Sequence, residues 1–175
     1  LHRRQRQMCI RDRLGSTIYG PSAEAGAAVG TSVDINDAGD KIVFGAYAYD
    51  GGSTNKGIAW VYSWNGSAWV IQDNSNSDLI GGSSRDSYGW RVSFDSDGDR
   101  LAISGYGGSN SPGIVGMYEW DGSSWSIMGS TLTGSASYDR LGYGISLDAD
   151  GDQVAVGIRG EDGSAGDGSG AVSIY

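Results

Sequence analysis

One acidic motif occurs three times along this 175-residue chain, and it constrains the fold more than any other feature. The three copies occupy residues 33–40, 92–99 and 145–152, and each ends in Gly-Asp. The Gly-Asp pairs lie 59 and 53 residues apart. Self-similarity at a fixed spacing of this size is the sequence signature of a repeat protein. The chain is therefore built from copies of one structural unit.

Each copy of the unit predicts several short strands. A run of mostly apolar residues follows each Gly-Asp pair, which favours a strand that is covered on both faces. These runs occupy residues 41–45, 100–104 and 153–157. A glycine-rich loop then leads into a second run, at 58–64, 114–120 and 171–175, in which Tyr62, Tyr118 and Tyr175 hold equivalent places.

The first two copies continue through a hairpin whose ends are tryptophans. Trp64 and Trp69 flank Asn65-Gly66, and Trp120 and Trp125 flank Asp121-Gly122. Asn-Gly and Asp-Gly supply the positive φ angles that a tight turn requires. We interpret the tryptophans as cross-strand pairs that stabilise the outer hairpins. The alternative is that they are exposed platforms on which sugars stack.

Four short strands per unit, in meander order, predict an all-β chain made of β-propeller blades. The 31 glycines, 10 tyrosines and 6 tryptophans agree with many short strands. Residues 15–20 mirror 129–134, which close the second copy, so the chain is expected to begin inside an earlier blade. Because propellers close with about 4 to 8 blades, we expect an incomplete propeller. The predicted divisions are the end of a preceding blade at 14–29, blade 1 at 30–82, blade 2 at 83–135 and a partial blade 3 at 136–175.

Residues 1–13 differ from the rest of the chain and are expected to lie outside the fold. They hold five arginines, the only histidine (His2) and the only cysteine (Cys9). Residues 7–13 resemble the translation of a sequencing-library adapter, and we treat residues 1–13 as non-native. A basic targeting arm is the alternative.

The charge of the remainder argues against nucleic acid as a partner. Without residues 1–13, Lys plus Arg falls from 12 to 7 and Asp plus Glu from 21 to 20, so the net charge moves from -9 to -13. Binding a phosphate backbone needs a cationic footprint. With neither His nor Cys, residues 14–175 also offer no thiol catalysis and no histidine acid-base chemistry. No window approaches the roughly 18 apolar residues of a membrane span, so membrane insertion is not expected.

The repeat resembles the FG-GAP repeat of integrin α-chain propellers and of many surface proteins, from about residue 15 to 175. The Phe-Gly element corresponds to Val29-Gly30, Tyr88-Gly89 and Leu141-Gly142, with Asp86 and Asp139 upstream of the last two. The Gly-Ala-Pro element corresponds to residues 45–47, 104–106 and 157–159, none of which keeps the proline. The resemblance implies an extracellular or cell-surface binding scaffold.

The family also carries calcium loops at the place of the acidic motif. Oxygens at alternate positions could converge on one cation. The candidate ligands are Asp95, Asp97, Asp99, Asp148, Asp150 and Asp152. The spacing departs from the family pattern, because Arg100 and Gln153 stand where glycine is expected. The favoured interpretation is that these Asp residues hydrogen-bond the turn while Gly39, Gly98 and Gly151 adopt the left-handed conformation.

These observations predict a non-catalytic scaffold that presents the loops on one rim to a protein or glycan partner. The loops 50–56, 107–112 and 161–170 all join equivalent strands and are expected on the same rim. Glu161 and Asp162 could suggest glycosidase carboxylates, but their glycine-rich surroundings favour a solvated loop. A lectin, or the propeller portion of a larger secreted hydrolase, is the alternative. Further blades of the full-length chain are expected partners.

Overall fold

The computed structural model describes residues 13–20, 25–72, 79–108, 110–163 and 166–175. Residues 7–12 of the adapter-like sequence, with His2 and Cys9, lie outside the described residues. The described part contains twelve β-strands and no helix. Among these residues, no helix is long and apolar enough to cross a membrane.

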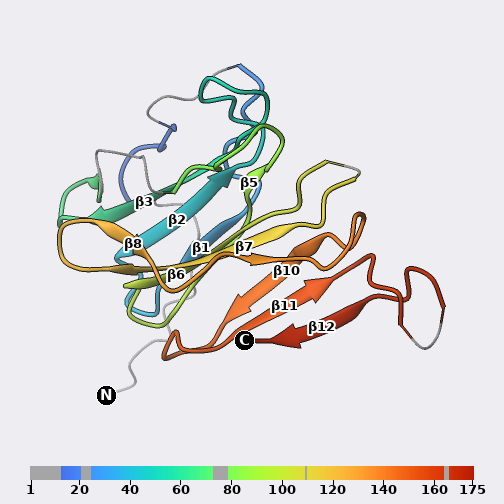
Figure 1. Ribbon diagram of the computed structural model, residues 1–175. Coiled ribbons are helices and arrows are strands. Elements are labelled where there is room, and N and C mark those ends of the chain that lie inside the picture. Colours follow the sequence, from blue (N-terminus) through green and yellow to red (C-terminus); the bar gives the residue numbers. More distant parts are fainter. Residues whose placement is uncertain (1–12, 21–24, 73–78, 109, 164–165) are drawn as a thin grey trace.

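The strands form three antiparallel sheets in chain order (Figure 1). The first sheet contains β1 (Val33–Ile35), β2 (Lys41–Ala46), β3 (Ile58–Trp64) and β4 (Trp69–Ile71). The second contains β5 (Tyr88–Phe94), β6 (Arg100–Gly105), β7 (Ile114–Trp120), β8 (Trp125–Ile127) and, paired with β7, β9 (Leu132–Thr133). The third contains β10 (Leu141–Leu147), β11 (Val154–Ile158) and β12 (Ala171–Ile174). The all-β fold of antiparallel meander blades is confirmed.

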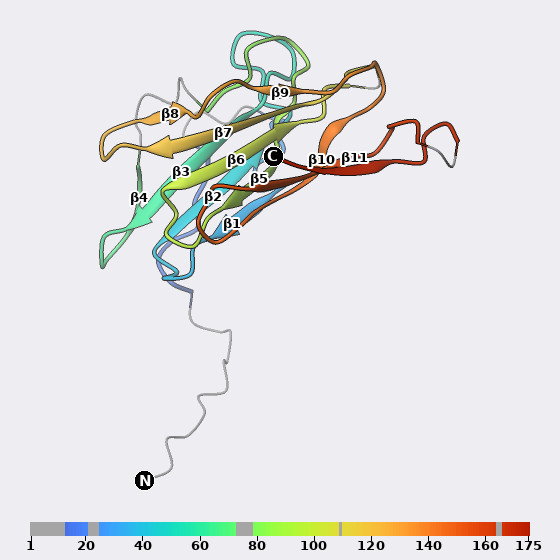
Figure 2. The ribbon, with the colours of Figure 1, turned by 60° about the horizontal axis from the view of Figure 1, so that its bottom comes forward.

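The sheets stack face to face as successive blades. Strand β5 lies against β1, β2 and β3 of the first sheet, and β10 lies against β5, β6 and β7 of the second. Apolar clusters fill both junctions: Val43, Val61, Val92 and Phe94 meet at the first junction. The described sheets form an open stack and not a closed ring (Figure 2).

The position of each sheet in the stack decides how completely its second strand is buried. As expected, β2 and β6 are buried over most of their length. Strand β11 instead alternates buried and half-buried residues. This difference arises because, in the described part of the chain, no further sheet covers the outer face of the third sheet.

The tryptophan pairs pack across the hairpins, as expected. Trp64 lies opposite Trp69 with ring centroids 5.4 Å apart, and Trp120 lies opposite Trp125 at 5.6 Å. The hairpin turns differ from the prediction in one respect. Only the glycines, Gly66 and Gly122, have positive φ.

The residue before each glycine acts through its side chain. Asn65 Oδ1 accepts hydrogen bonds from the backbone N–H of Ser67 and Ala68, at 3.0 and 2.9 Å. Asp121 Oδ1 accepts the equivalent bonds from Ser123 and Ser124, both 2.8 Å. These bonds close a four-residue turn, so Asn65 and Asp121 do not need a left-handed backbone.

Candidate functional site

The acidic motifs form the turns between the first two strands of each sheet, and their leading residue closes the turn. Asp95 Oδ1 accepts hydrogen bonds from the backbone N–H of Asp99 and Arg100, both 3.1 Å. Asp148 Oδ1 accepts them from Asp152 and Gln153, also 3.1 Å. Gly39, Gly98 and Gly151 have φ values of 72°, 65° and 69°, as the turn interpretation predicts.

Each acidic turn is also bonded to the next one. The backbone N–H of Asp37 donates to Ser96 O and that of Ser96 donates to Ala149 O, both at 3.0 Å. Lys41 Nζ donates to Asp97 O at 2.9 Å, and Arg100 Nη1 donates to Asp150 O at 3.1 Å. The acidic turns therefore hold adjacent sheets in register.

Asp95 and Asp148 hold equivalent places in their turns, but their pKa values are shifted in opposite directions because only the turn of Asp95 is covered by a following sheet. Asp95 is only 6 % exposed, beneath the turn of the third sheet at Gly151, and this burial raises its pKa, with the neighbouring Asp99 adding to the rise. The pKa of Asp148 is lowered, mainly by the hydrogen bond from the backbone of Gln153. The difference follows from burial, because desolvation disfavours a charged carboxylate.

The structure assigns no shared ligand geometry to the predicted calcium residues. Asp95 and Asp148 use Oδ1 for the turn, and Asp97 and Asp150 accept hydrogen bonds through their backbone carbonyls. Within the described ranges, no three His, Cys, Asp or Glu side chains are grouped closely enough to hold a metal ion. Calcium binding by Asp95, Asp97, Asp99, Asp148, Asp150 and Asp152 stays a prediction.

The strand ends opposite the acidic turns form a surface, here called the loop rim, that carries two equivalent clefts. The loop rim comprises the β2–β3, β6–β7 and β11–β12 loops together with the connections that enter β5 and β10 (Figure 1). One cleft, of about 630 Å³, lies between residues 136–140 and the start of the β11–β12 loop. The other, of about 250 Å³, lies between residues 84–86 and the β6–β7 loop. The second and third repeats thus each form a cleft of the same construction.

The carboxyls in the clefts hold the connections in shape. Asp86 Oδ2 accepts a hydrogen bond from the backbone N–H of Ser83, and Asp139 Oδ2 accepts one from Ala136, both 2.6 Å. The backbone carbonyls of Asp86 and Asp139 accept the N–H of Gly107 and Gly160, at 3.1 and 2.8 Å. Asp86 and Asp139 therefore stabilise the backbone of the loop rim.

The cleft walls contain residues in the left-handed backbone region. Arg85 and its counterpart Tyr138 have φ values of 66° and 75°, and Arg140 has 54°. A residue other than glycine costs about 1 to 3 kcal/mol in such a conformation, and such residues gather at binding and catalytic sites. Arg85, Tyr138 and Arg140 therefore each raise the free energy of the folded state relative to glycine at the same position.

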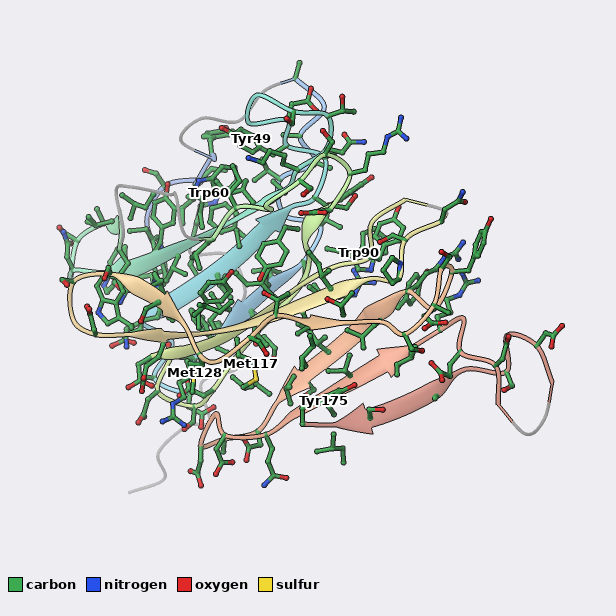
Figure 3. The ribbon with its side chains drawn as sticks, viewed as in Figure 1. Tyr49, Trp60, Trp90, Met117, Met128 and Tyr175 are labelled. Carbon is green, nitrogen blue, oxygen red and sulfur yellow. The ribbon has the colours of Figure 1, made fainter. Side chains whose placement is uncertain are left out.

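Half-buried aromatic rings at the loop rim form a continuous series of Tyr47, Trp90, Tyr106 and Tyr143, which ends at the exposed Arg159. We call these five residues the aromatic ladder. The centroid of Trp90 lies 5.3 Å from Tyr47, 4.4 Å from Tyr106 and 5.8 Å from Tyr143. The Arg159 guanidinium carbon lies 5.1 Å from the centre of the Tyr143 ring. Figure 3 shows Trp90 at the strand ends from which the rim loops leave.

Two local features aim the ladder at the rim. Trp90 and Tyr143 each lie in a bulge at the start of an inner strand, directly after Gly89 and Gly142, whose φ values are 82° and 85°. A β-bulge re-aims a side chain and is common next to functional sites. Tyr106 directly follows β6.

The aromatic ladder was not predicted from the sequence, although the sequence contains a signal for it. Tyr47, Tyr106 and Arg159 occupy the same position in three repeats, and Trp90 and Tyr143 share another. Aromatic or arginine side chains recur at both positions. The aromatic contacts predicted from the sequence were those of the hairpin tryptophans, which pair near the strand ends away from the rim loops: Trp64, Trp69, Trp120 and Trp125.

Basic side chains also gather at the loop rim. Of the seven Lys and Arg residues after residue 13, Lys41 and Arg100 belong to the acidic turns. The other five belong to the loop rim or the adjoining strand start: Lys56, Arg85, Arg91, Arg140 and Arg159. Arg91 lies over the Trp90 ring, with its guanidinium carbon 4.6 Å from the centroid. The rim therefore offers cations and aromatic faces on an otherwise acidic chain.

Glu161 and Asp162 lie in the β11–β12 loop. Asp162 Oδ1 accepts the backbone N–H of Gly168 at 2.7 Å, and Glu161 O accepts that of Gly170 at 3.0 Å. Both residues thus contribute hydrogen bonds that shape their own loop.

The described part of the chain is therefore a stack of β-propeller-type blades whose loop rim carries the aromatic ladder. No protein-family model matches the chain, and no curated protein matches it. Among solved structures, it is similar to TolB from Acinetobacter baumannii, with a TM-score of 0.40 and 15% sequence identity. That match covers 85% of this chain and 31% of the TolB chain.

Proposed function

We propose that this chain is a non-catalytic binding scaffold of extracellular or cell-surface origin, whose partner binds at the loop rim. The aromatic ladder carries the proposal. Aromatic rings and arginines are enriched where proteins bind partners, because they offer large apolar area together with hydrogen-bond donors. The ladder spans all three sheets, so a ligand lying along it would contact several repeats at once.

The ladder favours a glycan as the partner, with a protein partner as the second candidate. Sugar rings present apolar C–H faces that stack on aromatic rings such as Tyr106 and Tyr143. Arg159, at the end of the ladder, can donate hydrogen bonds to hydroxyl or carboxylate oxygens of the sugar. Its place over Tyr143 leaves the guanidinium edge available for such bonds, because the residue is exposed.

An array of immobilised neutral and acidic oligosaccharides tests the glycan candidate. We expect the chain to bind a subset of the glycans, and Tyr106→Ala and Arg159→Ala each to weaken that binding about tenfold or more, equivalent to about 1.4 kcal/mol. Ile127→Ser is the control, because Ile127 is exposed on β8 in the outer hairpin.

An array with no signal would contradict the glycan candidate. Binding that survives both ladder substitutions unchanged would contradict the proposed site, whether the partner is a glycan or a protein. Circular dichroism of each variant establishes that the strands remain folded.

A further inference from the structure

The junction between adjacent sheets is made twice inside this chain, from equivalent residues. At the first junction, Val92 and Phe94 of β5 are 7% and 6% exposed, because they pack on Ala59 and Val61 of the first sheet. At the second junction, β10 packs on the second sheet in the same way, with Leu147 buried. One half of each junction is the first strand of a sheet, β5 or β10, and the other half is the face of the preceding sheet.

Both halves of a third junction are present and uncovered. Val33 and Ile35 of β1 occupy the positions of Val92 and Phe94, yet they are 66% and 54% exposed. Val172 and Ile174 of β12 occupy the positions of Ala59 and Val61, yet they are 73% and 70% exposed.

A glycine contact marks the same unused junction. Backbone segments of the following sheet lie so close to Gly57 and Gly113 that a Cβ would stand 2.1 Å from Tyr88 O or Leu141 O. Gly170 is the third-copy equivalent, with a φ of 76° against 75° and 83°. A Cβ at Gly170 would approach no atom nearer than 3.4 Å. Gly170 thus repeats the positive φ of Gly57 and Gly113, but no following sheet approaches it in the described part of the chain.

The free edge of β12 also differs from the edges of its equivalents β3 and β7. Ala59 N–H donates to Leu79 O at 2.9 Å, and Val115 of β7 pairs with Leu132 of β9. The equivalent strand β12 pairs with β11 alone among the described residues. Residues 15–20, which match 129–134 in sequence, lie instead on the first sheet, where Ile18 packs against the cluster that contains Phe44 and Trp60.

We propose that the third sheet of one copy of this chain binds the first sheet of a second copy, head to tail. Strand β1 of the second copy covers Val172 and Ile174, as β5 covers Ala59 and Val61 within one chain. The segment 15–20 of the second copy then lies beside β12, in the place that β9 has beside β7. We commit to a second copy as the occupant because its first sheet carries both β1 and the segment 15–20, the equivalents of β5 and β9. Such an interface is heterologous, since the two partners use different surfaces.

Complementation between two variants tests this proposal by sedimentation velocity over a wide concentration range. Wild type should form dimers and larger species as concentration rises. Val33→Lys damages only the first-sheet surface and Val172→Lys only the third-sheet surface, and each alone should associate at least about tenfold more weakly. Their equimolar mixture retains one intact pair of surfaces, so it should form a one-to-one dimer that does not grow.

Ile127→Lys is the matched control, because it places a lysine at another exposed apolar strand position and should associate like wild type. The variants change side chains that are exposed in a single chain, and circular dichroism checks that each is folded. A wild type that stays monomeric throughout would overturn the proposal. So would a mixture that forms no dimer, or an Ile127→Lys variant that is as impaired as Val172→Lys.

Discussion

Asn36, Asp95 and Asp148 occupy one position in three copies of the same turn, and their surroundings give them different chemistry. Each uses its side-chain Oδ1 to accept two backbone N–H groups. Asn36 additionally donates through Nδ2 to Asp40 Oδ1 at 2.9 Å. Asp95 instead places a buried carboxylate near Asp99, which raises its pKa. The amide is thus better suited than the carboxylate to the covered position.

Asp95→Asn should therefore stabilise the protein at neutral pH, by about 1 kcal/mol, the size of one hydrogen bond. The raised pKa means that the folded state binds the Asp95 proton more readily than the unfolded state does. Wild type therefore regains stability as pH falls through that pKa, and the advantage of the variant should shrink. Urea unfolding at a series of pH values between 7 and about 4 measures both effects.

Asp148→Asn is the control for this prediction, because the pKa of Asp148 is shifted in the opposite direction. A lowered pKa indicates that the ionised form is favoured in the folded state, so its replacement should reduce stability at neutral pH. Equal effects of the two substitutions would show that stacking of the turns does not control the carboxyls.

At the level of elements, glycines allow one sheet to approach the next. Gly57 and Gly113 precede the third strands of their sheets, and both have a positive φ. Gly170 has the same backbone conformation without the crowding from a following sheet. The three positions therefore separate the cost of backbone conformation from the cost of the sheet junction.

Substituting each of these glycines with alanine should give two levels of destabilisation. Gly170→Ala should cost about 1 to 2 kcal/mol, for a left-handed alanine. Gly57→Ala and Gly113→Ala should each cost about 1 to 3 kcal/mol more, because the Cβ collides with the backbone of the next sheet. Thermal and urea unfolding at low protein concentration compare the three, and equal losses would contradict the assigned role of the junction.

The strands were predictable from sequence because their signals are local and repeated. Apolar runs after Gly39, Gly98 and Gly151 indicated β2, β6 and β11, and the paired tryptophans indicated the outer hairpins. The aromatic ladder was not predictable in this way. It depends on bulges at Trp90 and Tyr143 and on the stacking of rings from adjacent sheets. The ring contacts between adjacent sheets link residues 37 to 53 positions apart in the sequence, and strand periodicity does not reveal them.

At the scale of the whole stack, the described sheets leave apolar surface exposed on the outer faces of the first and third sheets. A sheet edge and face that remain uncovered are sites for pairing with another chain. The acidic turns oppose association through charge repulsion, because they concentrate Asp residues at one end of each sheet. Salt at about 0.15 M screens such charges beyond about 8 Å, whereas the apolar contact that we propose between β1 of one copy and β12 of the other does not depend on charge.

If copies associate head to tail, thermal stability must depend on protein concentration, because binding stabilises the folded state by mass action. A concentration about 100 times the dissociation constant adds about 2.7 kcal/mol. For a chain of this size that corresponds to a rise of about 5 to 10 °C in Tm. Wild type and Ile127→Lys should show this rise in differential scanning calorimetry at about 0.15 M salt. Val172→Lys should melt at a nearly constant temperature, because its third-sheet surface no longer accepts Val33 and Ile35 of the next copy. A wild-type Tm that does not change with concentration would mean that the exposed ends do not bind each other.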